Sequence, residues 1–448
     1  MSQTLMISVS GMRGHVGTDL TPELVTRHAA ALGAWAKAAG KPLVVLGRDA
    51  RTSGPMFTLA AMAGLQSVGC DVIELGIVPT PTVQMAVEHH GAGAGLIITA
   101  SHNPIEWNAL KFVGPDGIFL DAEAGAVVRQ LAEAGPARGG WDGIGSTRHD
   151  PAAVARHLDA ILALPFVDAA AIRARRFVVA LDTVRGAGGP VISLLLERLG
   201  CTVHGIHLET DGIFPHPPEP LPENLADLTA LVRRADADLG IAIDPDVDRM
   251  AMTDETGRPI GEDYTVAFAC RAVLALSPKP GTVVVNLSTS LVVEDAARDL
   301  GARFVRAPVG EANVARAMRD EEATVGGEGN GGVMLPALHI GRDAPLAVAL
   351  VLHYLATTGQ RVSEAVAAVP GYTIVKAKGP RGADLADLYT RLRHRFPDAT
   401  ADLRDGLRLA WPDRWLHVRP SGTEPIVRYI AEAPTEADAK ALVDAAKA

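Results

Sequence analysis

The stretch from Lys41 to Gly76, "KPLVVLGRDARTSGPMFTLAAMAGLQSVGCDVIELG", has the pattern of a β-α-β unit. It opens with a short run of aliphatic residues, which is typical of a strand buried on both faces. A polar loop and an amphipathic segment follow, and the segment ends at Gly69, where a helix-terminating glycine is expected. A second apolar run closes the unit. The stretch therefore predicts an α/β fold.

The same plan occurs twice more, in residues 175–209 and 280–310, with the glycines at Gly200 and Gly301. Each copy is followed by another apolar run that ends in an unusual polar cluster. Repetition of one unit predicts three α/β domains with mixed sheets in tandem. Ligands of open α/β sheets bind beyond the carboxyl ends of strands, so three such loops can surround a single cleft.

The C-terminal part has a different pattern. The segment "WLHVRPSGTEPIVRYIAEA" from Trp415 reads strand, turn, strand, and a helix with Thr435 as its N-cap follows. We therefore expect a smaller C-terminal α+β domain that completes a central cleft. The predicted domain boundaries are 1–150, 151–253, 254–362 and 363–448.

Composition limits the class of protein. The 448 residues exceed the roughly 250–300 that one core supports, which agrees with several domains. The net charge of −10 argues against nucleic acid as a partner, because a sequence-independent binder carries a basic face. Three scattered cysteines and the lack of a long apolar run predict a cytoplasmic protein without a membrane partner. The expected state is a monomer or a homodimer, and the sequence alone does not decide between them.

The loop "DPDVDR" carries Asp244, Asp246 and Asp248. Three crowded carboxylates repel one another unless a cation neutralises them, and oxygen ligands favour Mg²⁺ or Ca²⁺ over Zn²⁺. An EF-hand is disfavoured because Arg249 occupies the place of its turn glycine. A dehalogenase-type phosphatase is disfavoured because Asp248 stands where Thr or Val is expected. An acidic surface turn is the remaining alternative, and the apolar strand before the loop argues against it.

The segment "GLIITASHNPIEWNALKF" places a serine directly after a buried strand, in a loop stiffened by Pro104. Ser101 lacks the GxSxG motif of a hydrolase, and a hydroxyl beside a divalent metal suits phosphoryl transfer better. Lys111 is the candidate general acid or base. The alternative for Lys111 is an ordinary exposed lysine without a catalytic role. The neighbouring His102, taken alone, would most often be a helper residue that forms a local hydrogen bond.

Three further loops carry candidate binding groups. "RPSGTEP" offers Arg419, hydroxyl groups and backbone amides that suit a phosphate, although a plain turn between strands is the alternative. "GGEGNGG" presents Glu328 and Asn330, which suit sugar hydroxyls. "SGMRGHVG" places Arg13 in what reads as a glycine-bounded turn.

Together, "TASHNP", "DPDVDR", "GGEGNGG" and "RPSGTEP", in this order over almost the whole chain, resemble the α-D-phosphohexomutase superfamily. The resemblance implies four domains around a cleft and transfer of phosphate between C6 and C1 of an aldohexose. It implies one Mg²⁺ per chain and a hexose bisphosphate, glucose or glucosamine 1,6-bisphosphate, as activator. It also implies a mobile fourth domain that closes over the phosphate.

The resemblance also implies a role for each matching residue. Ser101 is the phosphoserine and, with the three aspartates, a metal ligand. The implied catalytic residues are Ser101, Lys111, His102 and Arg13. The implied metal ligands are Ser101, Asp244, Asp246 and Asp248. The implied substrate-binding residues are Arg249, Glu328, Asn330, Arg419, Ser421, Gly422, Thr423 and Arg428.

The choice of sugar depends on finer features. Ser421, Gly422 and Thr423 resemble the phosphate loop of phosphoglucosamine mutases. Asn330 and Gly332 depart from the pattern of many phosphomannomutase/phosphoglucomutase relatives. Glucosamine phosphate is therefore the preferred substrate, with mannose or glucose phosphate as the alternative. A sugar phosphatase and a non-catalytic phosphosugar-binding protein are the remaining hypotheses.

Overall fold

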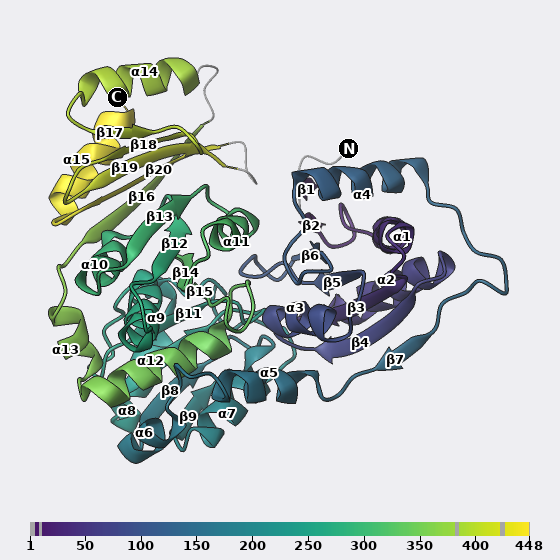
Figure 1. The fold of residues 1–448 in the computed structure, drawn as a ribbon, viewed down its shortest axis with the longest axis horizontal. Coiled ribbons are helices and arrows are strands. Elements are labelled where there is room, and N and C mark those ends of the chain that lie inside the picture. Colours follow the sequence, from purple (N-terminus) through teal and green to yellow (C-terminus); the bar gives the residue numbers. More distant parts are fainter. Residues whose placement is uncertain (1–4, 9–10, 381–384, 422–425, 448) are drawn as a thin grey trace.

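The computed structural model describes residues 5–8, 11–380, 385–421 and 426–447 (Figure 1). Its strands form four sheets of seven, four, four and five strands. Three sheets mix parallel and antiparallel pairs, and the fourth is antiparallel throughout. The predicted fold class, three α/β domains and a C-terminal α+β domain, is confirmed.

The first domain has a seven-stranded sheet in the order β1-β2-β6-β5-β3-β4-β7. Alternate side chains of β3 point to opposite faces, so Val44 and Leu46 pack with α1 and α2 while Val45 packs with α3. The elements are β1 (Met6–Ser8), β2 (Gly11–His15), α1 (Pro22–Ala38), β3 (Leu43–Arg48), α2 (Gly54–Ser67), β4 (Asp71–Ile77), α3 (Thr80–His89), β5 (Ala94–Ile98), β6 (Trp107–Val113), α4 (Ala122–Ala134) and β7 (Thr147–His149).

The second and third domains have four-stranded sheets in the orders β11-β10-β8-β9 and β13-β12-β14-β15. The second contains α5 (Ala153–Leu162), α6 (Ala169–Arg175), β8 (Val178–Asp182), α7 (Gly188–Arg198), β9 (Thr202–Ile206), η1 (Pro222–Asn224), α8 (Ala226–Ala235), β10 (Leu239–Ile243) and β11 (Met250–Thr253). The third contains α9 (Asp263–Leu276), β12 (Thr282–Asn286), α10 (Leu291–Asp299), β13 (Arg303–Ala307), α11 (Glu311–Asp320), β14 (Val325–Glu328), β15 (Gly332–Met334), α12 (Ala344–Thr358) and α13 (Val362–Ala367).

One hydrophobic core continues through the second and third domains. Leu181 of β8 and Val285 of β12 belong to the same buried cluster, together with the apolar faces of α9 and α12. These two domains are therefore packed as a single unit. The predicted boundaries between the domains stay predictions, since packing alone does not divide the chain.

The fourth domain stands at one end of the molecule (Figure 1). Its elements are β16 (Thr373–Pro380), α14 (Leu385–Arg395), β17 (Thr400–Asp402), β18 (Leu407–Ala410), β19 (Trp415–Pro420), β20 (Ile426–Ala433) and α15 (Glu436–Lys447). The predicted cap of the last helix is confirmed, because the Asp438 amide donates to Thr435 Oγ1 at 3.2 Å.

The three α/β domains share a hairpin that the repeat pattern only partly predicted. In each, a buried parallel strand ends in a polar turn and returns as an antiparallel strand. The three pairs are β5 with β6, β10 with β11, and β14 with β15. The turns hold Ser101, the three aspartates, and Glu328 with Asn330. One repeated element thus presents three of the five predicted functional loops.

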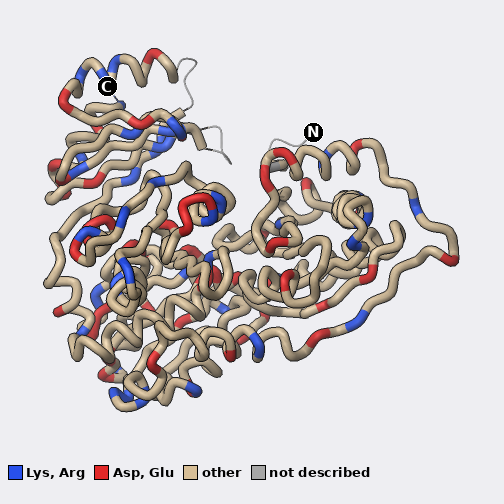
Figure 2. Tube along the Cα trace, viewed as in Figure 1, with Lys and Arg blue, Asp and Glu red and all other residues tan. Residues whose placement is uncertain are grey.

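None of the helices in the described ranges is long and apolar enough to span a bilayer. Acidic and basic residues are interspersed along the trace (Figure 2).

Candidate active site

Ser101 lies in the turn between β5 and β6, where it is only 2% exposed. Its backbone has a φ of 50°, a left-handed conformation that costs a non-glycine residue free energy. Its amide donates to Thr99 Oγ1 at 2.9 Å. Its hydroxyl donates to Asp244 Oδ2 at 3.0 Å, which joins the first domain to the second.

The guanidinium of Arg51 holds the serine loop in this strained shape. It donates to the carbonyl oxygens of Ser101 and Asn103 at 2.6 Å each, and to those of Pro104 and Trp107 at 2.7 and 2.8 Å. Asp49 accepts from its Nε at 3.1 Å. Arg51 is 1% exposed, so these bonds are made without competition from water.

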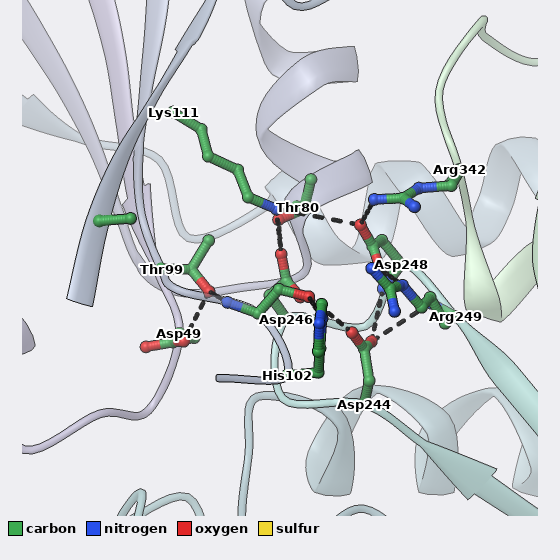
Figure 3. Close-up of polar contacts among 12 residues, drawn as sticks. Asp49, Thr80, Thr99, His102, Lys111, Asp244, Asp246, Asp248, Arg249 and Arg342 are labelled. Carbon is green, nitrogen blue, oxygen red and sulfur yellow. Dashed lines mark hydrogen bonds and ion pairs between the residues drawn. The ribbon is translucent and has the colours of Figure 1, made fainter. Parts of the chain in front are cut away.

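Asp244, Asp246 and Asp248 are buried in the turn between β10 and β11, and each places a carboxylate oxygen within 4.8 Å of the other two (Figure 3). Among the described residues, Oδ1 of Asp246 and Oδ1 of Asp248 are buried and have no hydrogen-bond partner, although Arg249 Nε lies 3.5 Å from Asp248 Oδ1. Such oxygens are costly unless a cation binds them. The trio therefore fits a hard divalent cation such as Mg²⁺.

Burial and the charges of Asp248 and Asp246 raise the pKa of Asp244 well above its usual range. Burial would also raise the pKa of Asp246, but the charge and hydrogen bond of Lys111 hold it below the usual range. Burial and repulsion therefore disfavour the charged form of Asp244, the carboxylate that accepts from Ser101, whereas Lys111 stabilises the charged form of Asp246.

Two cations reach the trio from other elements (Figure 3). Lys111, on β6, donates from Nζ to Asp246 Oδ2 at 2.7 Å. Arg342, in the loop before α12, donates from Nη2 to Asp248 Oδ2 at 2.6 Å. Thr80, at the start of α3, also donates to Asp246 Oδ2, at 2.8 Å. Residues of all three α/β domains therefore meet at the trio.

The remaining predicted residues of the first two domains lie beside the serine. His102 Nδ1 is 3.3 Å from Ser101 Oγ, and its pKa is held well below the usual range by burial and by the charges of Arg249 and Arg13. Burial and the charge of Arg249 also lower the pKa of Arg13 to about 10. Arg13 Nη1 donates to Asn103 Oδ1 at 2.5 Å.

The turn predicted around Arg13 is wrong. The residue lies inside β2 and pairs with Ala109 of β6. The flanking glycines suggested a turn, but Met12 is buried in the core and Gly14 pairs with Asn108, so the segment extends as a strand.

Glu328 is the last residue of β14, and Asn330 lies in the turn between β14 and β15. The carboxylate of Glu328 accepts from Arg342 Nη1 at 2.9 Å, from Asn286 Nδ2 at 2.9 Å and from the Gly310 amide at 3.0 Å. Asn330 accepts from the Gly332 amide at 3.3 Å. Both side chains are thus engaged within the third domain, and their contact with a sugar stays a prediction.

The predicted residues of the fourth domain divide into two groups. Arg428 faces a cleft against the first two domains. Arg419 instead donates from Nε to Asp405 Oδ2 at 2.9 Å, and Ser421 donates its amide to Ile426 O at 2.8 Å. Gly422 and Thr423 lie outside the described residues.

Two clefts share Arg13 in their linings, and the first of them reaches Ser101. The first, of about 340 Å³, is lined by residues of the first three domains, including Arg13, Ser101, Lys111, Arg249 and Arg342. The second, of about 800 Å³, lies between the first, second and fourth domains. Its lining includes Arg13, His102, Glu219, Lys376, Lys378 and Arg428. The cationic side chains of this acidic protein are therefore gathered where an anionic ligand would enter.

The sequence matches the four successive models of the phosphoglucomutase/phosphomannomutase family. The α/β/α domains I, II and III match residues 5–138, 155–257 and 261–372, and the C-terminal domain matches residues 361–448. The chain belongs to this family.

Relatives in the family are similar over nearly their full lengths. The chain is 38% identical to the "Probable phosphoglucosamine mutase" of Methanopyrus kandleri, over 97% of this chain and 95% of the relative. It is also 38% identical to the "Phosphoglucomutase/phosphomannomutase" of Thermococcus kodakarensis, over 97% and 96%. The crystal structure of a phosphoglucomutase/phosphomannomutase family protein from Burkholderia thailandensis superposes with a TM-score of 0.86, at 25% identity over 99% and 97% of the two chains.

Several site residues were missed by sequence reasoning. Arg51, Thr80 and Arg342 each stand alone in unremarkable stretches. Their respective contacts with Ser101, Asp246 and Asp248 span 50 residues or more. The one feature of the sequence that could have pointed to Arg51 is its place in the polar loop after the first strand of the first repeat, where ligand-binding residues are expected. Nothing in the sequence near Arg342 indicated that it bridges Asp248 and Glu328.

Proposed function

We propose that this protein interconverts hexose 6-phosphate and hexose 1-phosphate through a phosphoserine at Ser101 and a hexose 1,6-bisphosphate, with glucosamine phosphate as the preferred substrate. The observation that carries the proposal is the 3.0 Å contact between Ser101 Oγ and Asp244 Oδ2. This contact joins a hydroxyl group of one domain to a buried carboxylate of another, and Ser101 lines a cleft together with Arg and Lys side chains.

Asp244, Asp246 and Asp248 would hold Mg²⁺, with Ser101 adjoining them. When bound, the ion would neutralise charge that develops on the transferring phosphoryl group. The feature that supports this assignment is Oδ1 of Asp246, which is buried and has no hydrogen-bond partner in the part of the chain that the structure describes.

Phosphoryl transfer would proceed in two halves. First, a sugar hydroxyl oxygen attacks the phosphorus of phosphoserine, the bond to Ser101 Oγ breaks, and the hydroxyl proton passes to a base. The bisphosphate then turns over, Ser101 Oγ attacks the other phosphorus, and the bond from that phosphorus to the sugar oxygen breaks. A general acid would protonate the leaving sugar oxygen, and the product is released. Glucose or glucosamine 1,6-bisphosphate would supply the phosphate that first loads the serine.

Lys111 is the proposed general acid or base, because it lines the cleft within 2.7 Å of Asp246. Arg13 and His102 would orient the phosphoserine, and Arg249 would stabilise the metal loop. Arg428 would grip the phosphate that is not reacting, with Arg419, Ser421, Gly422 and Thr423 completing that site. Closure of the fourth domain over the larger cleft would exclude water, which would otherwise hydrolyse phosphoserine.

A second candidate substrate has its own support. The Thermococcus kodakarensis relative named phosphoglucomutase/phosphomannomutase is as similar to the chain, at 38%, as the phosphoglucosamine mutase of Methanopyrus kandleri. Mannose or glucose phosphate is therefore the alternative. Glu328 and Asn330 are the proposed contacts with the sugar hydroxyls.

The test is a phosphorus NMR assay with Mg²⁺ and a trace of the matching 1,6-bisphosphate. Each hexose 6-phosphate is incubated with the wild-type protein and with Ser101→Ala. We expect hexose 1-phosphate to accumulate fastest from glucosamine 6-phosphate, and not to form with Ser101→Ala. Release of inorganic phosphate without an isomer would identify a phosphatase instead. Binding without turnover of any hexose phosphate would identify a sensor.

The cytoplasmic location and a monomeric or homodimeric state are further parts of the proposal. Fractionation of cells and size-exclusion chromatography with light scattering would test them.

A further inference from the structure

A second group of metal-ligating side chains lies in the second domain, separate from the aspartate trio. Asp182 ends β8, His207 follows β9, and His216 lies in the loop that comes next. One carboxylate oxygen and one ring nitrogen from each histidine lie within 4.8 Å of one another. These residues are not part of the mechanism proposed above.

The separations between these atoms fit ligands around one ion, and they also fit hydrogen bonds. His207 Nδ1 is 3.2 Å from both oxygens of Asp182, and His216 Nε2 is 3.1 Å from Oδ2. Two atoms at Zn²⁺ bonding distance, placed at the tetrahedral angle, lie about 3.3 Å apart.

The tautomer of His216 is fixed by its other nitrogen. Nδ1 lies 2.9 Å from the carbonyl oxygen of Pro217, which can only accept, so Nδ1 carries a proton. In the neutral ring, Nε2 then carries the lone pair that can bind a cation shared with Asp182, and an N–H bond to a backbone carbonyl is the usual support of a metal-ligating histidine. Without a cation, the protonated ring would donate to both Pro217 O and Asp182 Oδ2.

The backbone presents these ligands at a cost. His207, Val184 and Arg185 all have left-handed φ angles, of 54°, 49° and 57°. Such a conformation is an outlier for a β-branched residue such as valine. The Val184 amide donates to Asp182 Oδ1 at 2.9 Å, which orients the carboxylate toward the two rings.

We propose that Asp182, His207 and His216 bind one Zn²⁺, with solvent completing the coordination. Two imidazole ligands and one carboxylate favour Zn²⁺ over Mg²⁺, which prefers oxygen. The histidine side chains are 22% and 16% exposed, so an ion has a route of entry.

The site would anchor the loop from His207 to Glu219 against the catalytic region. Phe214 of this loop lies 5.0 Å from the Arg51 guanidinium. Glu219 lies 3.9 Å from His102 Nε2 and 3.8 Å from Arg249 Nη1. Zinc binding would thus stabilise a wall of the larger cleft without touching the reacting atoms.

The experiment is a titration of the full-length protein with Zn²⁺ in excess Mg²⁺, against a chromophoric chelator. We expect one Zn²⁺ ion to bind tightly per chain. In the double variant His207→Gln/His216→Gln, the affinity for Zn²⁺ should be at least about 100-fold lower, because loss of a ligand costs more than loss of a group that only supports a ligand. His204→Gln, exposed on β9, is the matched control and should bind as the wild type does. Zn²⁺ should also raise the melting temperature of the wild type.

Zn²⁺ could also bind to the aspartate trio, and the variant Asp248→Asn distinguishes the two sites. This variant should still bind one Zn²⁺ tightly. Substitution with Co²⁺ adds a readout on the wild-type protein, since a tetrahedral site with nitrogen ligands gives an intense visible band and an octahedral oxygen site does not. The proposal is overturned by the absence of a tight equivalent, by its loss in Asp248→Asn, by equal binding to the double variant, or by a weak octahedral Co²⁺ spectrum. A hydrogen-bonded Asp–His network without metal would then explain the contacts.

Discussion

At the scale of single residues, Arg51 determines the geometry of the serine loop. Four carbonyl oxygens of that loop converge on one guanidinium, whose planar fork of donors an ammonium cannot reproduce. The positive φ of Ser101 persists because these contacts over-determine the loop.

Arg51→Lys should therefore lower the free energy of unfolding by about 2–4 kcal/mol, since buried carbonyl oxygens lose charged donors. It should also slow phosphorylation of Ser101, because the hydroxyl is no longer fixed at Asp244. Arg48→Lys is the control, as Arg48 donates to a single carbonyl oxygen, that of Asp49. Urea denaturation and a phosphoserine time course measure the two effects. Equal losses of stability and of phosphorylation rate in both variants would contradict the role of Arg51 in fixing the serine loop.

The aspartate trio leads to a prediction about metal. Mg²⁺ should raise the melting temperature of the wild type, because binding relieves repulsion between buried carboxylates, and chelation should abolish turnover. Asp248→Asn should remove most of the rise. Asp236→Asn is the control, being an exposed residue of the same domain whose left-handed conformation Asn tolerates. A melting temperature that Mg²⁺ leaves unchanged would contradict the assignment, and scanning calorimetry measures it.

At the scale of elements, the site is built from one hairpin used three times. The turns of the second and third hairpins touch directly, since the Met250 amide donates to Gly331 O at 3.2 Å. Gly331 has a φ of 86°, and a Cβ there would lie 2.2 Å from the Met250 carbonyl oxygen. Close approach of the two backbones therefore requires glycine at this position.

Gly331→Ala should lower the free energy of unfolding by roughly 1 kcal/mol for the left-handed backbone and by a further 1–3 kcal/mol for the displaced hairpin. Gly301→Ala is the matched control, because Gly301 has a φ of 67° with open space around its Cβ position, and it should show the first cost alone. Similar losses in the two variants by chemical denaturation would show that the contact between hairpins is unimportant.

At the scale of the whole molecule, contacts between domains complete the site. His417 of β19 is buried where the fourth domain meets the third. Its Nε2 donates to Asp405 O at 2.7 Å, and its Nδ1 accepts from Ser288 Oγ at 2.8 Å. Burial lowers the pKa of His417 to about 4.

The sign of the pH effect follows from that shift. Between pH 6.5 and 4 the unfolded chain binds a proton at His417 and the folded chain does not. The contribution of His417 to the free energy of unfolding is therefore complete above pH 6.5 and declines as the pH falls toward 4. The slope is about 1.4 kcal/mol per pH unit. His417→Gln should flatten the fall in stability over this range, and the exposed His394→Gln should leave it unchanged. Denaturation measured from pH 7 to 4 tests this, and parallel curves for all three proteins would exclude His417 as the source.

The sequence predicted what is local or repeated. Strand runs, helix-ending glycines and the aspartate loop are contiguous signals, and each appears where expected. Arg51, Thr80 and Arg342 were missed because their roles arise from contacts between distant segments. The turn predicted at Arg13 was wrong. The flanking glycines are typical of a turn, whereas the structure buries Met12 in the core and extends the segment as a strand. The shared core of the second and third domains was also beyond reach, since helix α12 is apolar over most of its surface and could have packed on either sheet.

The central claim is that Ser101 carries the phosphoryl group during turnover. The most direct measurement is intact-mass and peptide mass spectrometry after incubation with Mg²⁺ and glucose or glucosamine 1,6-bisphosphate. The account predicts one phosphate per chain, located on Ser101, absent from Ser101→Ala, and discharged on addition of hexose 6-phosphate. An active protein without phosphate at Ser101, or with phosphate on another residue, would contradict it.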